Sequence, residues 1–198
     1  MSTLSIEHLS VSAGEKQLLS DISLTLQSGE MHILMGPNGS GKSSLLNALM
    51  GHPRYTITEG KMVLDGEEIT SLSTEKKAKL GLFLSLQHLP EIAGVTLTNF
   101  LHRAAKEVKG STQGPLEFYR ASEAKAKEAG IDPVFLKKHV NTGLSGGEKK
   151  QSEVLQLLIL EPKFAFLDEI DSGVDVDAMK KVYAGIERLR ASGMGFLL

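Results

Sequence analysis

Apolar and polar residues alternate through the first part of the chain. Apolar side chains recur at every second position within residues 4–6, 9–11 and 22–26. A period of two is typical of strands that bury one face. The pattern therefore predicts half-buried strands in the N-terminal region.

A second apolar pattern begins at residue 29. The stretch GEMHILMG, residues 29–36, is short and nearly continuously apolar, as expected of a strand buried on both faces. A glycine-rich loop follows, and then KSSLLNALM, residues 42–50, whose composition and spacing favour a helix. This order predicts a strand–loop–helix unit. Two more buried strands are expected at residues 82–86 and 163–167.

Turn and helix signals divide the rest of the chain. Asp-Gly at residues 65–66 lies between apolar residues and indicates a short hairpin. Residues 73–81, STEKKAKLG, predict a helix that is closed by its glycine. From about residue 96 to 139 the chain is predicted to be helical, and Asp-Pro at 132–133 indicates a helix start with proline at the first helical position.

The last helices differ in character. Residues 146–161 predict a helix that is apolar nearly all round from Val154 onward, so we expect it to be buried. An amphipathic helix is expected to extend to about residue 192. The sequence shows no repeat and no low-complexity linker. The pattern therefore indicates an α/β core interrupted by a helical insert.

Composition narrows the function. With 198 residues the chain is long enough for one core with a smaller inserted subdomain. The net charge of −2 argues against a nucleic-acid partner, because such domains usually carry a basic surplus. The absence of cysteine excludes disulfides, thiolate metal sites and a cysteine nucleophile. The start lacks the pattern of a signal peptide and the longest apolar stretch, 154–160, is too short to span a bilayer, so we expect a cytoplasmic protein without membrane insertion.

The glycine-rich loop carries the first chemical signal. Residues 36–43, GPNGSGKS, fit G-x-x-x-x-G-K-[ST] after a predicted strand and at a predicted helix start. Backbone N–H groups of such a loop form an anion-binding concavity, and the helix N-terminus adds positive potential. Lys42 would reach the β- and γ-phosphates of ATP, and the Ser43 hydroxyl would ligate Mg²⁺. A simple glycine-rich turn is the alternative, which the flanking elements disfavour. The predicted phosphate-binding residues are Gly36, Pro37, Asn38, Gly39, Ser40, Gly41, Lys42, Ser43 and Ser44.

A cluster of acids follows the strand 163–167. Asp168 stands where P-loop nucleotidases place the acid that holds Mg²⁺, and Glu169 would act as the general base on the attacking water. We expect the metal, together with Lys42, to neutralise the cluster. Acids that only cap the next helix are the alternative. The cluster comprises Asp168, Glu169, Asp171, Asp175 and Asp177, and we interpret Asp171 and Asp177 as solvated.

A third signal is LSGGEKK, residues 144–150. Ser145, Gly146 and Gly147 at a helix start form a second phosphate-binding turn. A plain N-cap is the alternative. Two such turns in one chain are explained if two copies pair head-to-tail, each turn closing the site of the other copy.

These motifs, in this order, resemble an ATP-binding-cassette ATPase domain over essentially the whole chain. The resemblance implies an α/β P-loop NTPase with a mixed sheet, an antiparallel β subdomain and a helical insert. Residues 1–86 and 162–198 would form the catalytic core, and 87–161 the helical subdomain. Gln87 would help to organise Mg²⁺ and the attacking water, Asp175 would communicate across a transient head-to-tail homodimer, and Ser145 to Gly147 would contact the γ-phosphate held by the other copy.

Several variants are similar to one branch of this family. SGGEKK and DEIDSGVDVDAM differ from the LSGGQ and DEPTSALD of most transporter cassettes. They resemble the ATPase subunit of the SUF iron–sulfur cluster assembly machinery, whose implied partners are two related scaffold proteins (SufB/SufD-like). The alternatives are the nucleotide-binding subunit of a membrane transporter and a non-hydrolysing nucleotide-binding module.

Some features depart from the family pattern. The family's γ-phosphate histidine follows the strand that begins near Phe196, whereas all six histidines here precede the acid cluster. We therefore expect a C-terminally truncated version, or a remainder that comes from elsewhere. Gln151 replaces a basic residue, and VSAGEKQLL offers no aromatic ring for adenine. The lysines at 76, 77 and 79 are interpreted as the solvated face of a helix, with a partner surface as the alternative.

Overall fold

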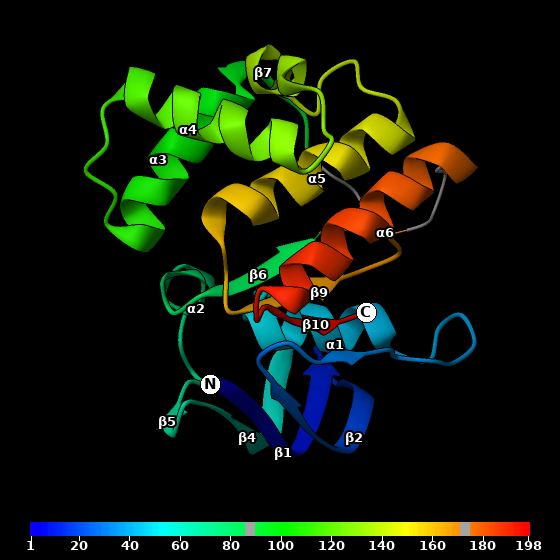
Figure 1. The fold of residues 1–198 in the computed structure, drawn as a ribbon. Helices are drawn as coiled ribbons and strands as arrows, with labels where there is room; N and C mark the ends of the chain where they lie inside the picture. Colours follow the sequence, from blue (N-terminus) through cyan, green and yellow to red (C-terminus); the bar gives the residue numbers. More distant parts are fainter. Residues whose placement is uncertain (86–89, 171–174) are drawn as a thin grey trace. The chain divides into compact units, whose positions relative to one another are not determined.

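The computed structural model describes residues 1–85, 90–170 and 175–198. The chain forms two compact units (Figure 1). The first contains Met1–Ser85, Pro162–Asp168 and Arg190–Leu198, and the second contains Leu86–Glu161 and Glu169–Leu189. Residues 169–189, which the sequence assigned to the core, thus group with the helical insert.

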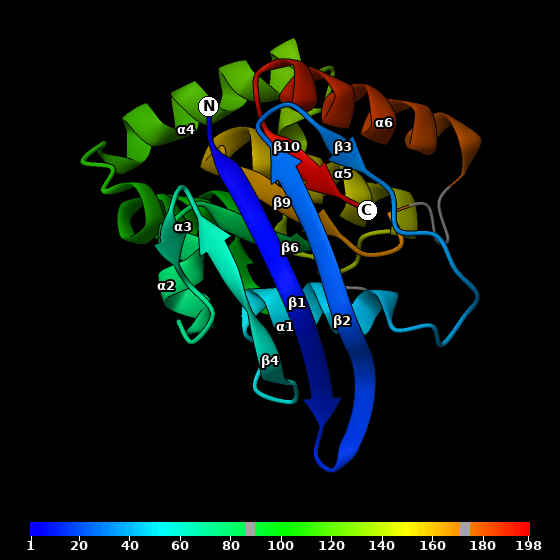
Figure 2. The ribbon, with the colours of Figure 1, turned by 90° about the horizontal axis from the view of Figure 1, so that it is seen from below.

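An antiparallel sheet opens the first unit. Strands β1 (Thr3–Ala13) and β2 (Lys16–Gln27) run side by side as a long hairpin, and β4 (Thr56–Leu64) pairs with the other edge of β1 (Figure 2). The short β5 (Glu67–Glu68) completes the order β2-β1-β4-β5. The predicted hairpin at residues 65–66 is confirmed, since it joins β4 to β5 with both residues at positive φ.

A bulge in β1 explains the change of phase in its apolar pattern. Leu4 and Ile6 are buried at even positions and Leu9 and Val11 at odd positions. The register with β2 shifts between Ile6 and Leu9, around His8 with φ 51°. The extra residue returns all four apolar side chains to the same buried face.

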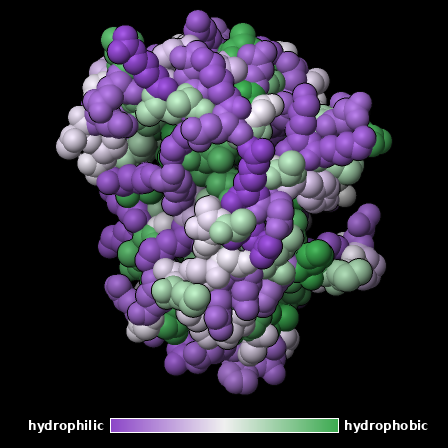
Figure 3. Space-filling view, in the orientation of Figure 1, coloured by the Kyte–Doolittle hydropathy of each residue, from purple (hydrophilic) through white to green (hydrophobic). Residues whose placement is uncertain are grey.

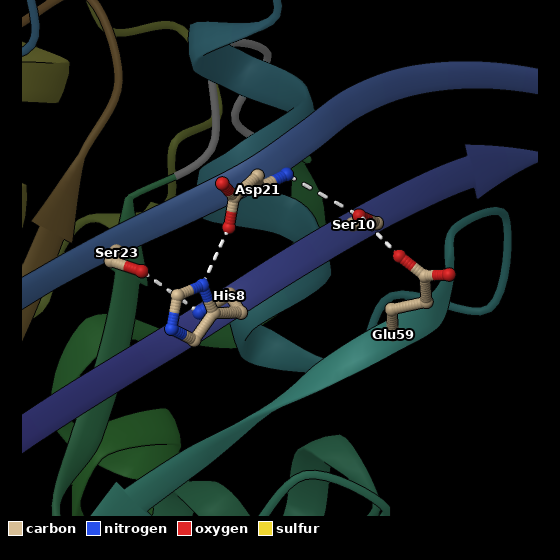
Figure 4. Close-up of polar contacts among 5 residues, drawn as sticks. All are labelled: His8, Ser10, Asp21, Ser23 and Glu59. Carbon is tan, nitrogen blue, oxygen red and sulfur yellow. Dashed lines mark hydrogen bonds and ion pairs between the residues drawn. The ribbon is translucent and has the colours of Figure 1, made fainter.

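Polar contacts surround this bulge (Figure 4). The His8 ring lies 2.7 Å from a carboxylate oxygen of Asp21, and the His8 N–H donates to the Ser23 hydroxyl at 2.9 Å. The Asp21 N–H donates to Ser10 Oγ at 3.3 Å, and the Ser10 hydroxyl donates to Glu59. His8 and Asp21 are largely exposed, so we assign their pair a small share of the stability.

A parallel sheet forms the core of the first unit. Its order is β3 (Met31–His32), β10 (Gly195–Leu197), β9 (Phe164–Leu167) and β6 (Leu82–Ser85). The four residues of β9 are buried, which confirms the predicted strand at 163–167. The strand predicted at 82–86 is confirmed over 82–85, and Leu86 lies outside the described residues.

The strand predicted at 29–36, buried on both faces, is wrong in length and burial. Only Met31–His32 form β3, and Ile33 and Met35 are 66% and 90% exposed. β3 is the edge strand of the described sheet and pairs only with β10 there. Beyond β3, Leu34 is half-buried against the core, whereas Ile33 and Met35 on either side of it are exposed.

Two helices accompany these sheets. α1 (Lys42–Met50) buries Leu45, Leu46 and Leu49, and α2 (Thr74–Lys79) begins at the N-cap Ser73, as the sequence predicted. The interpretation of the lysines on α2 as a solvated face is wrong for Lys77. Its side chain is fully buried, and its ammonium donates to the Leu49 carbonyl at the C-terminal end of α1 at 2.9 Å.

The second unit is mainly helical, as predicted. α3 (Leu97–Lys109) and α4 (Pro115–Glu128) pack beside α5 (Gly146–Leu160) (Figure 1). A 3₁₀ helix η1 (Pro133–Lys137) begins at the N-cap Asp132. The strands β7 (Ile92–Thr96) and β8 (His139–Val140) pair with each other. α6 (Val176–Ala191) packs closely on α5, since a Cβ on Gly185 would lie 2.5 Å from Val154 Cγ1.

On the face in Figure 3, hydrophilic residues predominate and apolar residues appear as separate patches.

Within the described ranges, no helix is both long enough and apolar enough to cross a membrane. The architecture combines a parallel core sheet, an antiparallel sheet and a helical insert, and this confirms the predicted α/β P-loop fold class.

Candidate functional site

The glycine-rich loop is held in a conformation that favours glycine. It connects β3 to α1, and Gly39 and Gly41 have φ values of 82° and 99°. A Cβ on Gly41 would lie 2.6 Å from Leu19 Cδ2 on β2, so a larger residue would have to displace the Leu19 side chain. The sequence therefore uses glycine here for both backbone conformation and close packing.

The N-terminus of α1 is open to an anion. Its N-cap is Gly41, which supplies no side-chain cap, and its first turn carries no acid. The first intrahelical contact is the Leu45 N–H to the Gly41 carbonyl at 2.8 Å. The earlier N–H groups have no partner within the helix, and the helix dipole adds positive potential at the same place.

Lys42 brings a cation to the mouth of this loop. Its ammonium donates to the carbonyls of Gly36 and Pro37 at 2.7 and 3.2 Å. Within the described residues Lys42 and Asp168 form no ion pair, and neutralisation of the acids by the metal together with Lys42 stays a prediction. The lysine instead lies along the loop, where a bound phosphate would meet it.

Ser43 and Asp168 form a contact between the loop helix and the end of β9. The Ser43 hydroxyl donates to Asp168 Oδ1 at 3.1 Å, and Asp168 is only 6% exposed. Two neighbouring oxygen ligands of an octahedral Mg²⁺ lie about 3 Å apart. A hydroxyl and a carboxylate at this spacing therefore suit two ligand positions of a magnesium ion. Water and phosphate oxygens would supply most of its other ligands.

The acids after β9 have separate environments. Asp168 is buried, whereas Glu169 is exposed and has φ 49°, a left-handed conformation that costs a non-glycine residue about 1 kcal/mol. Asp175 accepts from the N–H groups of Asp177 and Ala178 and so caps α6. Asp171 lies outside the described residues, and in the described ranges no three acids or histidines gather around one point. Among the described acids of the cluster, Asp168, Glu169, Asp175 and Asp177, no group of three or more that could hold a metal ion is therefore present.

The turn that the sequence predicted as a second phosphate-binding site begins α5. Ser145 is the N-cap, and it forms a capping box with Glu148: the Ser145 N–H donates to Glu148 Oε2 at 2.9 Å, and the Glu148 N–H donates to Ser145 Oγ at 3.3 Å. Ser145 and Gly146 are exposed, and Gly147 is buried. The plain N-cap that the sequence offered as an alternative is thus present, and it leaves the turn accessible.

Lys138 is a residue of this region that sequence reasoning missed. Its ammonium lies 2.8 Å from Glu148 Oε1. The hydrogen bonds from Lys138 and from the backbone and hydroxyl of Ser145 lower the pKa of Glu148 from 4.5 to about 2. The only signal in the sequence was a basic residue shortly before the motif.

The structure does not test the predicted role of one site residue, Gln87. Gln87 lies outside the described residues, so its proposed role stays a prediction. Asn47 was not predicted: its amide donates to the Ser43 carbonyl at 2.7 Å and stiffens the first turn of α1.

Comparison with known proteins identifies the family. The model of the ABC transporter family matches residues 19–172, and the chain belongs to this family of ATP-binding cassettes. The vegetative protein 296 of Bacillus subtilis (strain 168) is 43% identical over 199 residues, which cover the whole of this chain and 76% of that protein. A "probable ABC transporter ATP-binding protein" of Streptococcus pyogenes serotype M3 is 43% identical over 200 residues, covering the whole chain and 78% of that protein.

Solved structures share the fold. An ATP-binding subunit of an ABC transporter has a TM-score of 0.81 at 23% identity, with 98% of this chain and 78% of that chain covered. A nucleotide-free ATP-binding cassette has a TM-score of 0.79 at 22% identity, with 100% and 80% covered. At this identity the likeness supports the fold alone.

Proposed function

We propose that this protein binds and hydrolyses Mg·ATP. The observation that carries the proposal is the pairing of Ser43 with the buried Asp168 beneath an open, glycine-rich helix N-terminus. The loop from Gly36 to Ser44 would bind the phosphates through its N–H groups, and Lys42 would exchange its carbonyl partners for the β- and γ-phosphate oxygens.

The donor set around Ser43 suits magnesium. Ser43 and Asp168, with Gln87 as a further ligand, would hold Mg²⁺ with oxygen atoms, which this ion prefers. When bound, the ion neutralises charge on the β- and γ-phosphates. The protein residues fix the position of the phosphates relative to the residues that act on water.

We assign Glu169 as the general base. It follows the buried Asp168 directly, and its left-handed backbone keeps its side chain exposed. Strained residues of this kind are frequent where a side chain must be aimed. Glu169 would accept the proton of the attacking water as the oxygen of water bonds to the γ-phosphorus and the bond to the β-phosphate oxygen breaks.

We further infer a transient head-to-tail homodimer in the presence of ATP. Ser145, Gly146 and Gly147 begin a 15-residue helix and present an accessible turn. In this arrangement they contact the γ-phosphate held by the other copy, and Asp175 lies in the loop that links the two sites. Residues 1–86 and 162–198 would act as the core and 87–161 as the helical subdomain.

For the partner, we propose a cytoplasmic iron–sulfur cluster scaffold of the SUF type. The support is the sequence of the two motifs, SGGEKK and DEIDSGVDVDAM, which resemble that branch. ATP-driven dimerisation would change the shape of two related scaffold proteins. A membrane transporter is the second candidate, because several relatives carry names such as ABC transporter ATP-binding protein.

Steady-state turnover tests the assignment of Glu169. We expect the parent to hydrolyse Mg·ATP and Glu169→Gln to lose about 10²-fold or more in kcat while it still binds ATP, because the general base is absent. Asp177→Asn is the matched control: it removes an exposed acid in the first turn of α6 and is expected to keep turnover. Equal turnover in the parent and Glu169→Gln would contradict the assignment. Binding without turnover in the parent would favour the nucleotide-binding module.

The partner proposal has a separate test. The tagged protein is isolated from its own cells in mild detergent, and its bound proteins are identified. Soluble scaffold proteins would support the SUF-type role, and membrane-spanning subunits would contradict it in favour of a transporter.

A further inference from the structure

Glu148 poses an electrostatic problem at the phosphate-binding turn of α5. This chain carries a carboxylate three residues after Ser145. A negative charge there opposes the approach of a phosphate unless a cation compensates it.

In the structure, Glu148 connects a cation to the turn. Its Oε1 accepts from the Lys138 ammonium at 2.8 Å, and its Oε2 accepts from the Ser145 N–H at 2.9 Å. The two side chains are 36% and 34% exposed, so water screens their charges only in part. The Lys138 ammonium also lies 5.0 Å from the centre of the Phe135 ring, which is buried. Lys138 is therefore held from two sides.

The same contacts fix the hydroxyl of Ser145. Its Oγ accepts from the Glu148 N–H at 3.3 Å, and this bond fixes the position of the oxygen at the start of α5. The orientation of Ser145 depends on the capping box, and the carboxylate of the box depends on Lys138. Lys138 therefore contacts the carboxylate that completes the Ser145 capping box.

We propose that Lys138 is a positioning residue for phosphate recognition: it neutralises Glu148 and holds the Ser145 capping box, so that the turn accepts the γ-phosphate bound by a second copy of the chain. The inference rests on the proposed head-to-tail dimer. It assigns a role to a side chain that lies outside the glycine-serine motif itself.

The test measures dimerisation by sedimentation equilibrium with Mg·ATP at low salt, in the Glu169→Gln background that slows turnover. Lys138→Met is expected to raise the dissociation constant of the dimer about tenfold, because an uncompensated carboxylate then meets the phosphate. Lys138→Arg keeps the charge and is expected to stay within about twofold of the background protein.

A second substitution distinguishes charge compensation from simple loss of structure. Adding Glu148→Gln to Lys138→Met removes the uncompensated charge and leaves an amide oxygen that can accept from the Ser145 N–H. We expect the double variant to return to within about threefold of the background protein. A double variant as weak as Lys138→Met, or a Lys138→Met protein that dimerises like its background, would overturn the proposal.

Binding of ADP to the monomer separates this inference from the proposed function. ADP lacks the γ-phosphate, so Lys138→Met should leave its affinity unchanged. If the background protein binds Mg·ATP but never dimerises, the head-to-tail arrangement is wrong and the role of Lys138 fails with it. If it dimerises and Lys138→Met has no effect, only the role of Lys138 fails.

Discussion

Lys77 shows how one buried side chain links the helix that carries the phosphate loop to its neighbour. Its ammonium donates to the Leu49 carbonyl, which lies in the last turn of α1. A cation at a helix C-terminus is stabilised by the helix dipole, but complete burial opposes the charged form. Burial lowers the pKa of Lys77 from 10.5 to about 8.

This lowered pKa predicts a rise in stability at alkaline pH. Below pH 8 both the folded and the unfolded protein carry the proton, and the folded state bears the full cost of the buried charge. Between about pH 8 and 10.5 the unfolded chain binds more protons, so the free energy of unfolding rises with pH. We expect the stability of the parent relative to Lys77→Met to increase by about 2 kcal/mol between pH 7.5 and 9.5.

Urea unfolding of both proteins across this range measures the difference. All other titrating groups are shared, so they cancel in the comparison. Lys79→Met serves as the control, because its ammonium is exposed and paired with Glu75. A parent-minus-Lys77→Met difference that stays flat with pH would contradict the assignment.

The residue scale also shows what the sequence could predict of the site. The phosphate loop, Asp168 and the turn at Ser145 are local motifs whose spacing encodes their chemistry. The sequence did not indicate that Lys138 would reach Glu148, nor that Lys77 would be buried, because both depend on how separate segments pack. The acids after β9 were predicted as one cluster, whereas in the structure Asp168 is buried and Asp175 caps α6.

At the scale of elements, the contact between α5 and α6 is unusually close. Gly185 lies in the middle of α6, and a Cβ there would be 2.5 Å from Val154 Cγ1 on α5. Val154 is buried and its β-branched side chain has little freedom to move aside. The small residue thus sets the distance between the two helices.

We therefore expect the effect of Gly185→Ala on stability to depend on residue 154. The substitution should destabilise the parent and stabilise a Val154→Ala variant. In the parent it should destabilise the fold by about 1 kcal/mol, because a steric cost of about 1–3 kcal/mol exceeds the gain in helix propensity of about 1 kcal/mol. In a Val154→Ala background the clash is gone and the same substitution should stabilise by about 0.5–1 kcal/mol. Thermal unfolding of the four proteins gives both values, and an equal effect in both backgrounds would refute the close contact.

The elements themselves were largely predictable, with one instructive exception. Alternation in β1 and β2, the Asp-Gly hairpin and the helices from 97 to 128 follow local patterns that the structure confirms. The run at 29–36 was predicted as a strand buried on both faces, yet β3 is two residues long. An apolar run indicates a preference for burial. Whether its residues are buried depends on the strands that pair with it in the folded sheet.

At the scale of the whole molecule, the comparisons support the family of the chain more firmly than they support any partner. The family model and the relatives agree on an ATP-binding cassette. The finer assignment to a cluster scaffold rests on short motifs, since the partner surface is a tertiary feature that no local pattern specifies. Both partner proposals require that the chain binds Mg·ATP at the same site.

Calorimetric titration of the 198-residue protein with Mg·ATP tests this claim most directly, with Lys42→Ala as the site variant and Lys61→Ala as the control. Lys61 pairs with Glu7 on the antiparallel sheet, away from the loop. We predict binding in the parent and in Lys61→Ala, and an affinity at least about tenfold lower in Lys42→Ala, because the phosphates lose their cation. Equal affinity in all three proteins, or no binding in the parent, would contradict the account.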